Sequence, residues 1–247
     1  MTPPLRARLK TAHGKALRGP FLAIPSPMVA EIACAARPDF VCIDMEHGPV
    51  SYQQVEDMIR AADLWGVAAL VRVRAPDPVA ISQVLDAGAA GVLVPRVSSV
   101  DEARLAVAAA RFLPEGRRGV GPGRASGYGR AIPAHLEAAR TQTLVAVQIE
   151  TVEALDDLPA ILSVPGIDLA FIGPGDLAIS LTASGREMSL EQAIDTIIAA
   201  AAAANCPVGI FALNRAAADA QAGRVALVIC GSDSTLLIEG FGATFGP

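Results

Sequence analysis

The chain has 247 residues, a formal net charge of −5 and a sequence pI near 5.2. Hydrophobic residues make up 52% of it and charged residues 18%. This composition supplies one large apolar core and is unlike that of a disordered protein. The acidic balance excludes a basic surface that would attract nucleic acid or an anionic membrane, and we expect neither partner.

The sequence predicts a cytoplasmic protein. No apolar run approaches the roughly 20 residues that a membrane-spanning helix needs. Residues 1–19 also lack an apolar stretch of signal-peptide length. The four cysteines lie far apart and form no CxxC pair, so we expect reduced, structural thiols at Cys34, Cys42, Cys206 and Cys230.

Short apolar runs alternate along the chain with longer, alanine-rich stretches of helical spacing. This alternation is typical of βα units around a parallel sheet. The predicted strands are Phe21 to Ile24, Phe40 to Asp44, Ala69 to Val73, Gly91 to Val94, Leu144 to Ile149, Leu169 to Gly173, Val208 to Ala212 and Ala226 to Cys230. Eight strands in about 250 residues predict an α/β fold, with a single TIM-type (β/α)8 barrel domain over residues 1–247.

The predicted helices would cover this barrel. They are Pro27 to Ala36, Tyr52 to Trp65, Pro78 to Ala87, Val100 to Arg111, Ala154 to Leu162, Ser189 to Ala203 and Arg215 to Gly223. The connection from Phe112 to Thr143 is long for a compact domain, and such a loop is usually a lid or a binding element. After the last strand only SDSTLLIEGFGATFGP remains, which is little material for an eighth covering helix. We expect this apolar C-terminal segment to dock on, or exchange with, a neighbouring subunit of a homo-oligomer.

The candidate site consists of polar residues at the carboxyl ends of the predicted strands, where TIM barrels carry their active sites. Four strands end in such residues: Asp44-Met45-Glu46-His47 after the second, Arg72 in the third, Gln148 and Glu150 after the fifth, and Gly173-Pro174-Gly175-Asp176 after the sixth. These tips would bring carboxylates, one imidazole and one guanidinium to a single rim.

Glu150 and Asp176 are candidate ligands of a divalent cation, because Mg²⁺ and Mn²⁺ prefer carboxylate oxygens and keep positions open for water and substrate. Either acid alone could instead be a helix cap or a solvated loop residue. The GPGD segment could present the N–H groups of Gly175 and Asp176 to a substrate carboxylate at a helix start. The alternative is a tight turn with Asp176 as the N-cap.

His47 is the candidate base, because it is the only one of the three histidines at a predicted strand tip. Arg72 lies in the apolar run ALVRV, where an unpaired charge would be costly, so it should meet an anion. That anion is either a developing enolate oxygen or a structural partner, Asp44 or Glu46.

The lysines exclude one mechanism. Lys10 and Lys15 are the only two, and both precede the first predicted strand. No lysine can therefore project from a barrel strand to form the Schiff base of a class I aldolase. Stabilisation of an enolate would then come from a metal ion and Arg72, as in a class II enzyme.

The chain resembles the HpcH/HpaI family of class II pyruvate aldolases, whose best-known activity is cleavage of 4-hydroxy-2-oxoheptanedioate. The resemblance runs through most of the chain and is carried, in order, by FVCIDMEHGP, VRV, QVLDAGAAGVLVPRV, RRGVG, VQIET, FIGPGDLA and GSDSTLL. It implies a metal-dependent aldolase, a carbon–carbon lyase, that joins the enolate of a pyruvate-like 2-oxoacid to an aldehyde or reverses that step. It also implies a homo-hexamer.

The resemblance implies a role for each matched residue. His47 would be the base, Arg72 the enolate stabiliser, Glu150 and Asp176 the ligands of Mg²⁺ or Mn²⁺, and Gln148 and the Gly175 amide contacts of the oxoacid. Co²⁺ is a further candidate metal, and Asp44 is a further catalytic candidate.

The acid that raises the basicity of the histidine in this family corresponds to Asp86 in QVLDAG. Asp86 falls near a predicted helix end that should face the opposite rim. Either that helix is irregular, or Asp86 reaches the site of a neighbouring subunit.

Departures from the family pattern lie on the aldehyde side of the pocket. Met45 replaces the glycine of D-G-E-H, and Phe21 takes the place of a tryptophan on the first strand. The long connection is shorter than in the family pattern and richer in glycine around Gly121 to Gly129. The acceptor aldehyde is therefore less well defined than the oxoacid.

Two alternative functions use the same fold. The first is a metal-dependent lyase of CoA thioesters, of the citrate or malyl type, although no extension or basic cluster suited to a nucleotide is visible in the sequence. The second is a non-catalytic barrel that binds small oxoacids. Metal-dependent exchange of the methyl protons of pyruvate would separate a catalyst from such a binder.

Overall fold

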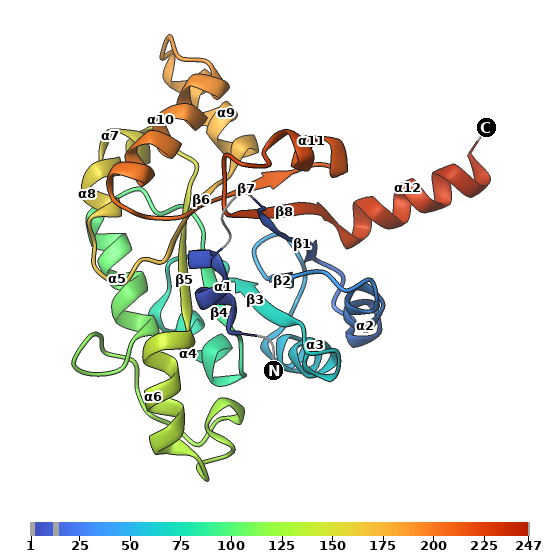
Figure 1. Cartoon of the computed structure of the whole chain (residues 1–247), viewed down its shortest axis with the longest axis vertical. Helices are drawn as coiled ribbons and strands as arrows, with labels where there is room; N and C mark the ends of the chain where they lie inside the picture. Colours follow the sequence, from blue (N-terminus) through green and yellow to red (C-terminus); the bar gives the residue numbers. More distant parts are fainter. Residues whose placement is uncertain (1–2, 12–14, 247) are drawn as a thin grey trace.

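The computed structural model describes residues 3–11 and 15–246. Eight parallel strands form a closed barrel in chain order, with helices around it (Figure 1). The strands are β1 (Leu17–Leu22), β2 (Phe40–Asp44), β3 (Ala68–Arg72), β4 (Gly91–Val94), β5 (Leu144–Ile149), β6 (Leu169–Ile172), β7 (Val208–Ala212) and β8 (Leu227–Ser232). Parallel pairing of β1 with β8 closes the barrel and confirms the predicted (β/α)8 fold.

The strands are apolar on both faces, because one face lines the barrel and the other packs under the helices. Phe40, Leu70 and Leu93 belong to the cluster that fills the barrel interior. Leu5 and Leu9 of helix α1 (Leu5–Thr11) join this cluster. The short amino-terminal helix thus completes the core of the barrel.

All seven predicted helices are present, one of them in two pieces. The helices after α1 are α2 (Pro27–Ala35), α3 (Tyr52–Leu64), α4 (Pro78–Asp86), α5 (Val100–Ala110), α6 (Ile132–Gln142), α7 (Val152–Asp156), α8 (Leu158–Leu162), α9 (Pro174–Ser184), α10 (Leu190–Ala203), α11 (Arg215–Ala220) and α12 (Asp233–Phe245). The single helix predicted from Ala154 to Leu162 is divided into α7 and α8 at Asp157, two residues before Pro159, which cannot donate an N–H to the helix ladder. Within the described residues, no helix is long and apolar enough to cross a membrane.

The first strand begins four residues earlier than predicted and ends at Leu22 rather than Ile24. The N–H groups of Ala23 and Ile24 donate to the carboxylate of Asp233 instead of to a neighbouring strand. Gly19 approaches β2 so closely that an added Cβ would lie 1.9 Å from the Phe40 carbonyl oxygen. The strand therefore passes through a glycine-proline pair that interrupts the apolar pattern.

The long connection from Phe112 to Thr143 is not a lid over this chain's own rim. It contains the 3₁₀ turn η1 (Arg124–Ser126) and helix α6. It joins the end of α5 to the start of β5, which places it at the amino end of the barrel, away from the catalytic rim of a TIM fold.

The C-terminal segment forms a helix, although not the covering helix for which the sequence offers little material. Ser232 and Thr235 form a capping box at the start of α12. The helix nevertheless projects away from the barrel (Figure 1), and Asp233 is its only buried residue. It therefore does not provide an eighth cover for its own barrel.

Candidate active site

A cavity of about 350 Å³ lies at the carboxyl end of the barrel. Its predicted site residues are Asp44, His47, Arg72, Gln148, Glu150, Gly175 and Asp176. Phe21, Phe211, Ser232 and Ser234, from β1, β7, β8 and the start of α12, line it as well. Among the predicted site residues, only Asp86 lies outside this cavity.

Asp44 and Arg72 form a buried, bidentate pair. Arg72 Nε donates to Asp44 Oδ1 at 2.9 Å, and Arg72 Nη2 donates to Asp44 Oδ2 at 2.7 Å. Burial opposes the charge on Arg72, but Asp44 outweighs it and holds the pKa of Arg72 above its ordinary value. The remaining nitrogen, Nη1, lies 3.2 Å from Glu46 Oε2. Both structural partners considered from the sequence are thus present.

The Arg72 guanidinium also lies over the ring of Phe21, with 4.2 Å between Cζ and the ring centroid. This is a cation–π contact. Phe21 packs against Phe211 at a centroid distance of 5.9 Å. The phenylalanine that replaces the expected tryptophan therefore supports Arg72 as well as the wall of the cavity.

His47 stands at the cavity with 58% of its side chain exposed. Asp44 Oδ1 accepts the backbone N–H groups of Glu46 at 3.0 Å and His47 at 3.3 Å, which fixes the turn after β2. His47 Nε2 lies 4.0 Å from Glu46 Oε2, a distance too long for a hydrogen bond. Burial raises the pKa of Glu46, and the nearby positive charge of Arg72 opposes this rise.

Glu150 is buried and held at both carboxylate oxygens. The N–H of Arg96 donates to Oε1 at 2.8 Å, and Gln148 Nε2 donates to Oε2. Burial raises the pKa of Glu150, while the bonds from Gln148 and Arg96 oppose the rise. A Cβ at position 173 would lie 2.5 Å from Glu150 Oε2, so Gly173 leaves the room that this carboxylate occupies.

Helix α9 begins at the cavity. Its N-cap is Gly173, which offers no side chain, and Asp176 occupies the third position of the first turn. The alternative of Asp176 as the N-cap is therefore wrong. The first N–H groups of a helix have no partner within it, and those of Gly175 and Asp176 belong to this turn. A Cβ on Gly175 would meet only open space.

The residues at this rim fit a divalent cation. The rim carries four carboxylates, from Asp44, Glu46, Glu150 and Asp176, and two guanidinium groups, from Arg72 and Arg96, which pair with Asp44 and Glu46 only. Among the described residues, three buried side-chain atoms lack a hydrogen-bond partner, and two of them, Glu46 Oε2 and Gln148 Oε1, lie here. Glu46 Oε2 still has an ion-pair contact with Arg72 Nη1 at 3.2 Å, so Gln148 Oε1 is the one of the two without any partner. An excess of negative charge beside such an oxygen is what a cation and its water ligands would satisfy.

The described residues contain no group of three His, Cys, Asp or Glu side chains placed to hold a metal ion. Glu150 and Asp176 line the same cavity, and Asp176 contributes to the raised pKa of Glu150. These two carboxylates could therefore hold a cation, with its other positions open for substrate and water.

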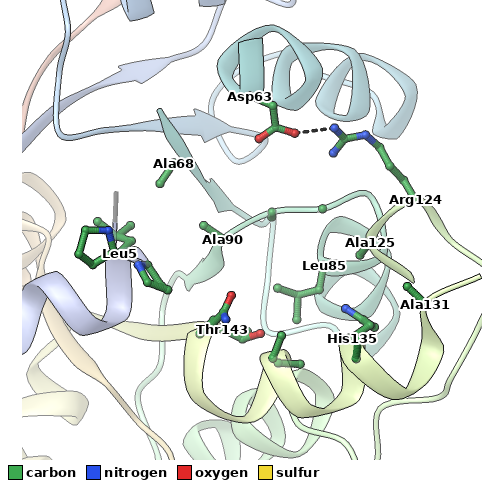
Figure 2. Close-up of a pocket in the computed structure, with 18 of the residues that line it drawn as sticks. Leu5, Asp63, Ala68, Leu85, Ala90, Arg124, Ala125, Ala131, His135 and Thr143 are labelled. Atoms are coloured by element: carbon green, nitrogen blue, oxygen red, sulfur yellow. Dashed lines mark hydrogen bonds and ion pairs between the residues drawn. The ribbon is translucent and has the colours of Figure 1, made fainter. Parts of the chain in front are cut away.

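Asp86 lies at the last position of α4 and accepts a 2.6 Å hydrogen bond from the buried Arg118. Helix α4 runs back from the catalytic rim, so its end lies at the amino end of the barrel. A second cavity, of about 740 Å³, opens there beside His135, and Figure 2 shows Arg124 paired with Asp63 across it. Within one chain, the structure does not bring Asp86 to His47.

Two residues at the rim, Glu46 and Arg96, were not assigned a functional role from the sequence. Glu46 was considered only as a structural partner of Arg72. Arg96, whose N–H holds Glu150, was not considered at all. Its signal was available, because the fourth apolar run is followed at once by Pro95 and the charged Arg96, as other strand tips are followed by polar residues.

Comparison with known proteins identifies the family. Residues 18–240 match the model of the HpcH/HpaI aldolase/citrate lyase family. The chain belongs to this family. A relative from Salmonella arizonae, named 4-hydroxy-2-oxo-heptane-1,7-dioate aldolase, is 40% identical over 232 residues, which are 92% of this chain and 88% of the relative. The predicted resemblance is confirmed, and with it the prediction of an aldolase, a carbon–carbon lyase.

Solved structures of HpcH/HpaI type share the whole fold. A family protein from Burkholderia cenocepacia J2315 has a TM-score of 0.90 and 34% identity, covering 97% of this chain and 96% of its own. Citrate synthase SbnG has a TM-score of 0.84 and 28% identity, covering 98% and 95%. Proteins similar to this HpcH/HpaI chain thus share its barrel but are named for different reactions.

Proposed function

We propose that this chain catalyses the reversible aldol reaction between a pyruvate-like 2-oxoacid and an aldehyde, with a divalent cation held by Glu150 and Asp176. One observation supports the proposal above all others. The same cavity is lined by both of these acids, by the candidate base His47 and by Arg72. The aldolase names of the curated relatives support this reaction over a CoA-thioester lyase.

The oxoacid half of the cavity is formed by β5, β6 and the start of α9. When bound, a divalent cation would polarise the ketone of the oxoacid and make its C3 proton more acidic. The first turn of α9 offers the N–H of Gly175 to the substrate carboxylate. Gln148 holds Glu150 with its amide nitrogen, and its own side-chain oxygen has no hydrogen-bond partner in the chain. Carboxylate ligands favour Mg²⁺ or Mn²⁺, with Co²⁺ as a third candidate.

The proton transfer is assigned to His47, whose exposed imidazole lies at the cavity on a turn that Asp44 fixes. Arg72 would stabilise the negative charge that develops on the ketone oxygen. Asp44 orients its guanidinium through two hydrogen bonds and leaves Nη1 outside that pair. Phe21, Phe211 and the hydroxyl groups of Ser232 and Ser234 form the side left for the aldehyde.

Deuterium exchange tests this proposal before the aldehyde is known. Pyruvate in deuterated water should lose its methyl protons when the protein and Mn²⁺ or Mg²⁺ are present, and should retain them when a chelator is added. Glu150→Gln should reduce the exchange rate strongly. Adducts with a panel of aldehydes, identified by mass spectrometry, then define the acceptor.

Three results would count against the proposal. Exchange that persists after complete removal of metal would rule out the role of the cation. Tight binding of CoA in calorimetry, with no exchange of pyruvate, would favour the thioester lyase instead. Binding of pyruvate without exchange would leave a non-catalytic oxoacid-binding barrel.

We also infer a homo-oligomer in which α12 packs on a second copy of the chain. The helix projects from the barrel and exposes Leu236, Leu237, Ile238, Phe241 and Phe245. An apolar face of this kind marks an interaction surface. A catalytic role of Asp86 would likewise require a neighbouring subunit. The cytoplasmic location and the absence of nucleic-acid and membrane partners stay predictions from the sequence.

A further inference from the structure

The tip of β4 carries a residue that the mechanism above leaves without a role. Arg96 follows this strand and has a φ of 53°. Residues other than glycine rarely adopt this left-handed conformation, and they retain it at functional sites because the surroundings impose it. The side chain of Arg96 is 68% exposed, so its own burial does not explain the conformation.

The left-handed backbone directs an N–H group at the candidate metal ligand. The N–H of Arg96 donates to Glu150 Oε1 at 2.8 Å. The next residue, Val97, donates its N–H to the carbonyl oxygen of Gln148 at 3.3 Å. Two successive amides thus join the tip of β4 to the tip of β5. Since Gln148 holds the other oxygen of Glu150, the carboxylate is restrained from both sides.

The Arg96 side chain meets a second acid of the rim. Its Nε lies 3.4 Å from Glu46 Oε1, and the other oxygen of Glu46 lies 3.2 Å from Arg72 Nη1. One residue therefore contacts Glu150 through its main chain and Glu46 through its guanidinium. These two contacts can be separated by substitution, because only the second depends on the side chain.

We propose that Arg96 is a positioning residue, whose left-handed backbone holds Glu150 in the orientation in which this carboxylate binds the divalent cation. The inference rests on the proposed metal site. Residues that position the ligands of a metal commonly change its affinity 10- to 100-fold when they are altered. Backbone conformation at position 96 should therefore control metal affinity more than the charge of its side chain does.

Two uncharged substitutions test this directly. Asparagine tolerates the left-handed region, whereas the β-branched valine does not. Arg96→Val should rotate the backbone and remove the N–H from Glu150, while Arg96→Asn should keep it. Calorimetry of the metal-free protein with Mn²⁺ should give a Kd about tenfold or more higher for Arg96→Val than for Arg96→Asn. The difference between Arg96→Asn and the unaltered protein measures the guanidinium contact with Glu46.

Arg37 supplies the matched control. It also has a left-handed backbone, with a φ of 57°, but it follows α2 and lies at the amino end of the barrel. Arg37→Val should lower the Tm relative to Arg37→Asn and leave the Kd for Mn²⁺ unchanged. If Arg96→Val does not fold, Arg96→Ala compared with Arg96→Gly poses the same question with less strain.

The outcomes distinguish a failure of the positioning role of Arg96 from a failure of the proposed metal site. Equal Mn²⁺ affinity for the valine and asparagine variants at position 96 would overturn the positioning role. A rise in Kd for Arg37→Val as large as that for Arg96→Val would overturn it too, because the effect would then be general destabilisation. If the unaltered protein does not bind Mn²⁺, the proposed metal site itself fails.

Discussion

Arg72 contacts two of the acidic side chains of the rim, Asp44 and Glu46. Its guanidinium uses two nitrogens for Asp44 and places the third 3.2 Å from Glu46. Phe21 covers the face of the same group. A planar fork with fixed donors suits this arrangement, which an ammonium group could not reproduce. The sequence left open whether Arg72 meets a structural anion or an enolate, and the geometry accommodates both.

Substitution of the two candidate catalytic residues should abolish most activity without unfolding the barrel. His47→Ala and Arg72→Ala are each expected to lower kcat by roughly 10²-fold or more, since one removes the base and the other the charge that stabilises the enolate. Steady-state cleavage of an aldol adduct measures the loss, and circular dichroism checks the fold. Near-normal turnover in either variant would refute its assigned role.

Gly173→Ala should weaken metal binding. The added Cβ would lie 2.5 Å from Glu150 Oε2 and 3.0 Å from Gln148 Nε2, so the carboxylate must move. We expect the Kd for Mn²⁺ to rise about tenfold. Gly119→Ala is the control, because a Cβ there meets nothing within 4 Å and the residue does not line the active-site cavity, so the Kd should stay unchanged. Equal metal affinity of the two variants would contradict the placement of the ion at Glu150.

Among the secondary-structure elements, the bounds of the fully buried strands are predicted most accurately from the sequence. The predicted bounds of β2, β4, β5 and β7 agree with the structure to the residue. Each of these strands is a continuous apolar run, or nearly so, because both of its faces are covered. The first strand was misplaced because Arg18, Gly19 and Pro20 interrupt its pattern.

Elements that depend on distant partners were harder to predict. Helix α1 is short and charged, and only Leu5 and Leu9 reveal that it packs against the barrel interior. The candidate site was predicted as a set of strand tips, since the tips follow from the strands. The positive φ of Arg96 was not predictable, because it depends on an acceptor 54 positions away in sequence.

The junction of β1 with α12 depends on one buried acid. The carboxylate of Asp233 is 5% exposed and accepts the N–H groups of Ala23 at 3.1 Å and Ile24 at 2.9 Å. Asp233→Ala would leave both donors unpaired and should reduce the free energy of unfolding by about 2–3 kcal/mol, measured in urea. Asp101→Ala, at a side chain that is 92% exposed, should change it by less than about 1 kcal/mol. Similar losses in the two variants would show that the loop after β1 is held by other contacts.

In the whole molecule, the barrel is closed, and the C-terminal helix α12 does not pack along it. Eight strands close without any contribution from α12. The helix exposes 60% of Phe241 and 79% of Phe245 and ends far from the barrel (Figure 1). Exposed aromatic side chains on a projecting helix are costly in water unless another surface covers them. We therefore propose that a second copy of the chain covers this helix in a closed, symmetric assembly.

Light scattering coupled to size-exclusion chromatography tests this assembly. The unaltered chain should elute at a multiple of its 25.3 kDa mass. The double variant Leu237→Ser, Phe241→Ser should shift it toward the monomer, because both substitutions remove apolar area from the projecting helix. Glu239→Ser alters the same helix without removing apolar area and should leave the mass unchanged. A stable monomer of the unaltered chain at micromolar concentration would contradict the assembly, and with it any catalytic role for Asp86 in a neighbouring subunit.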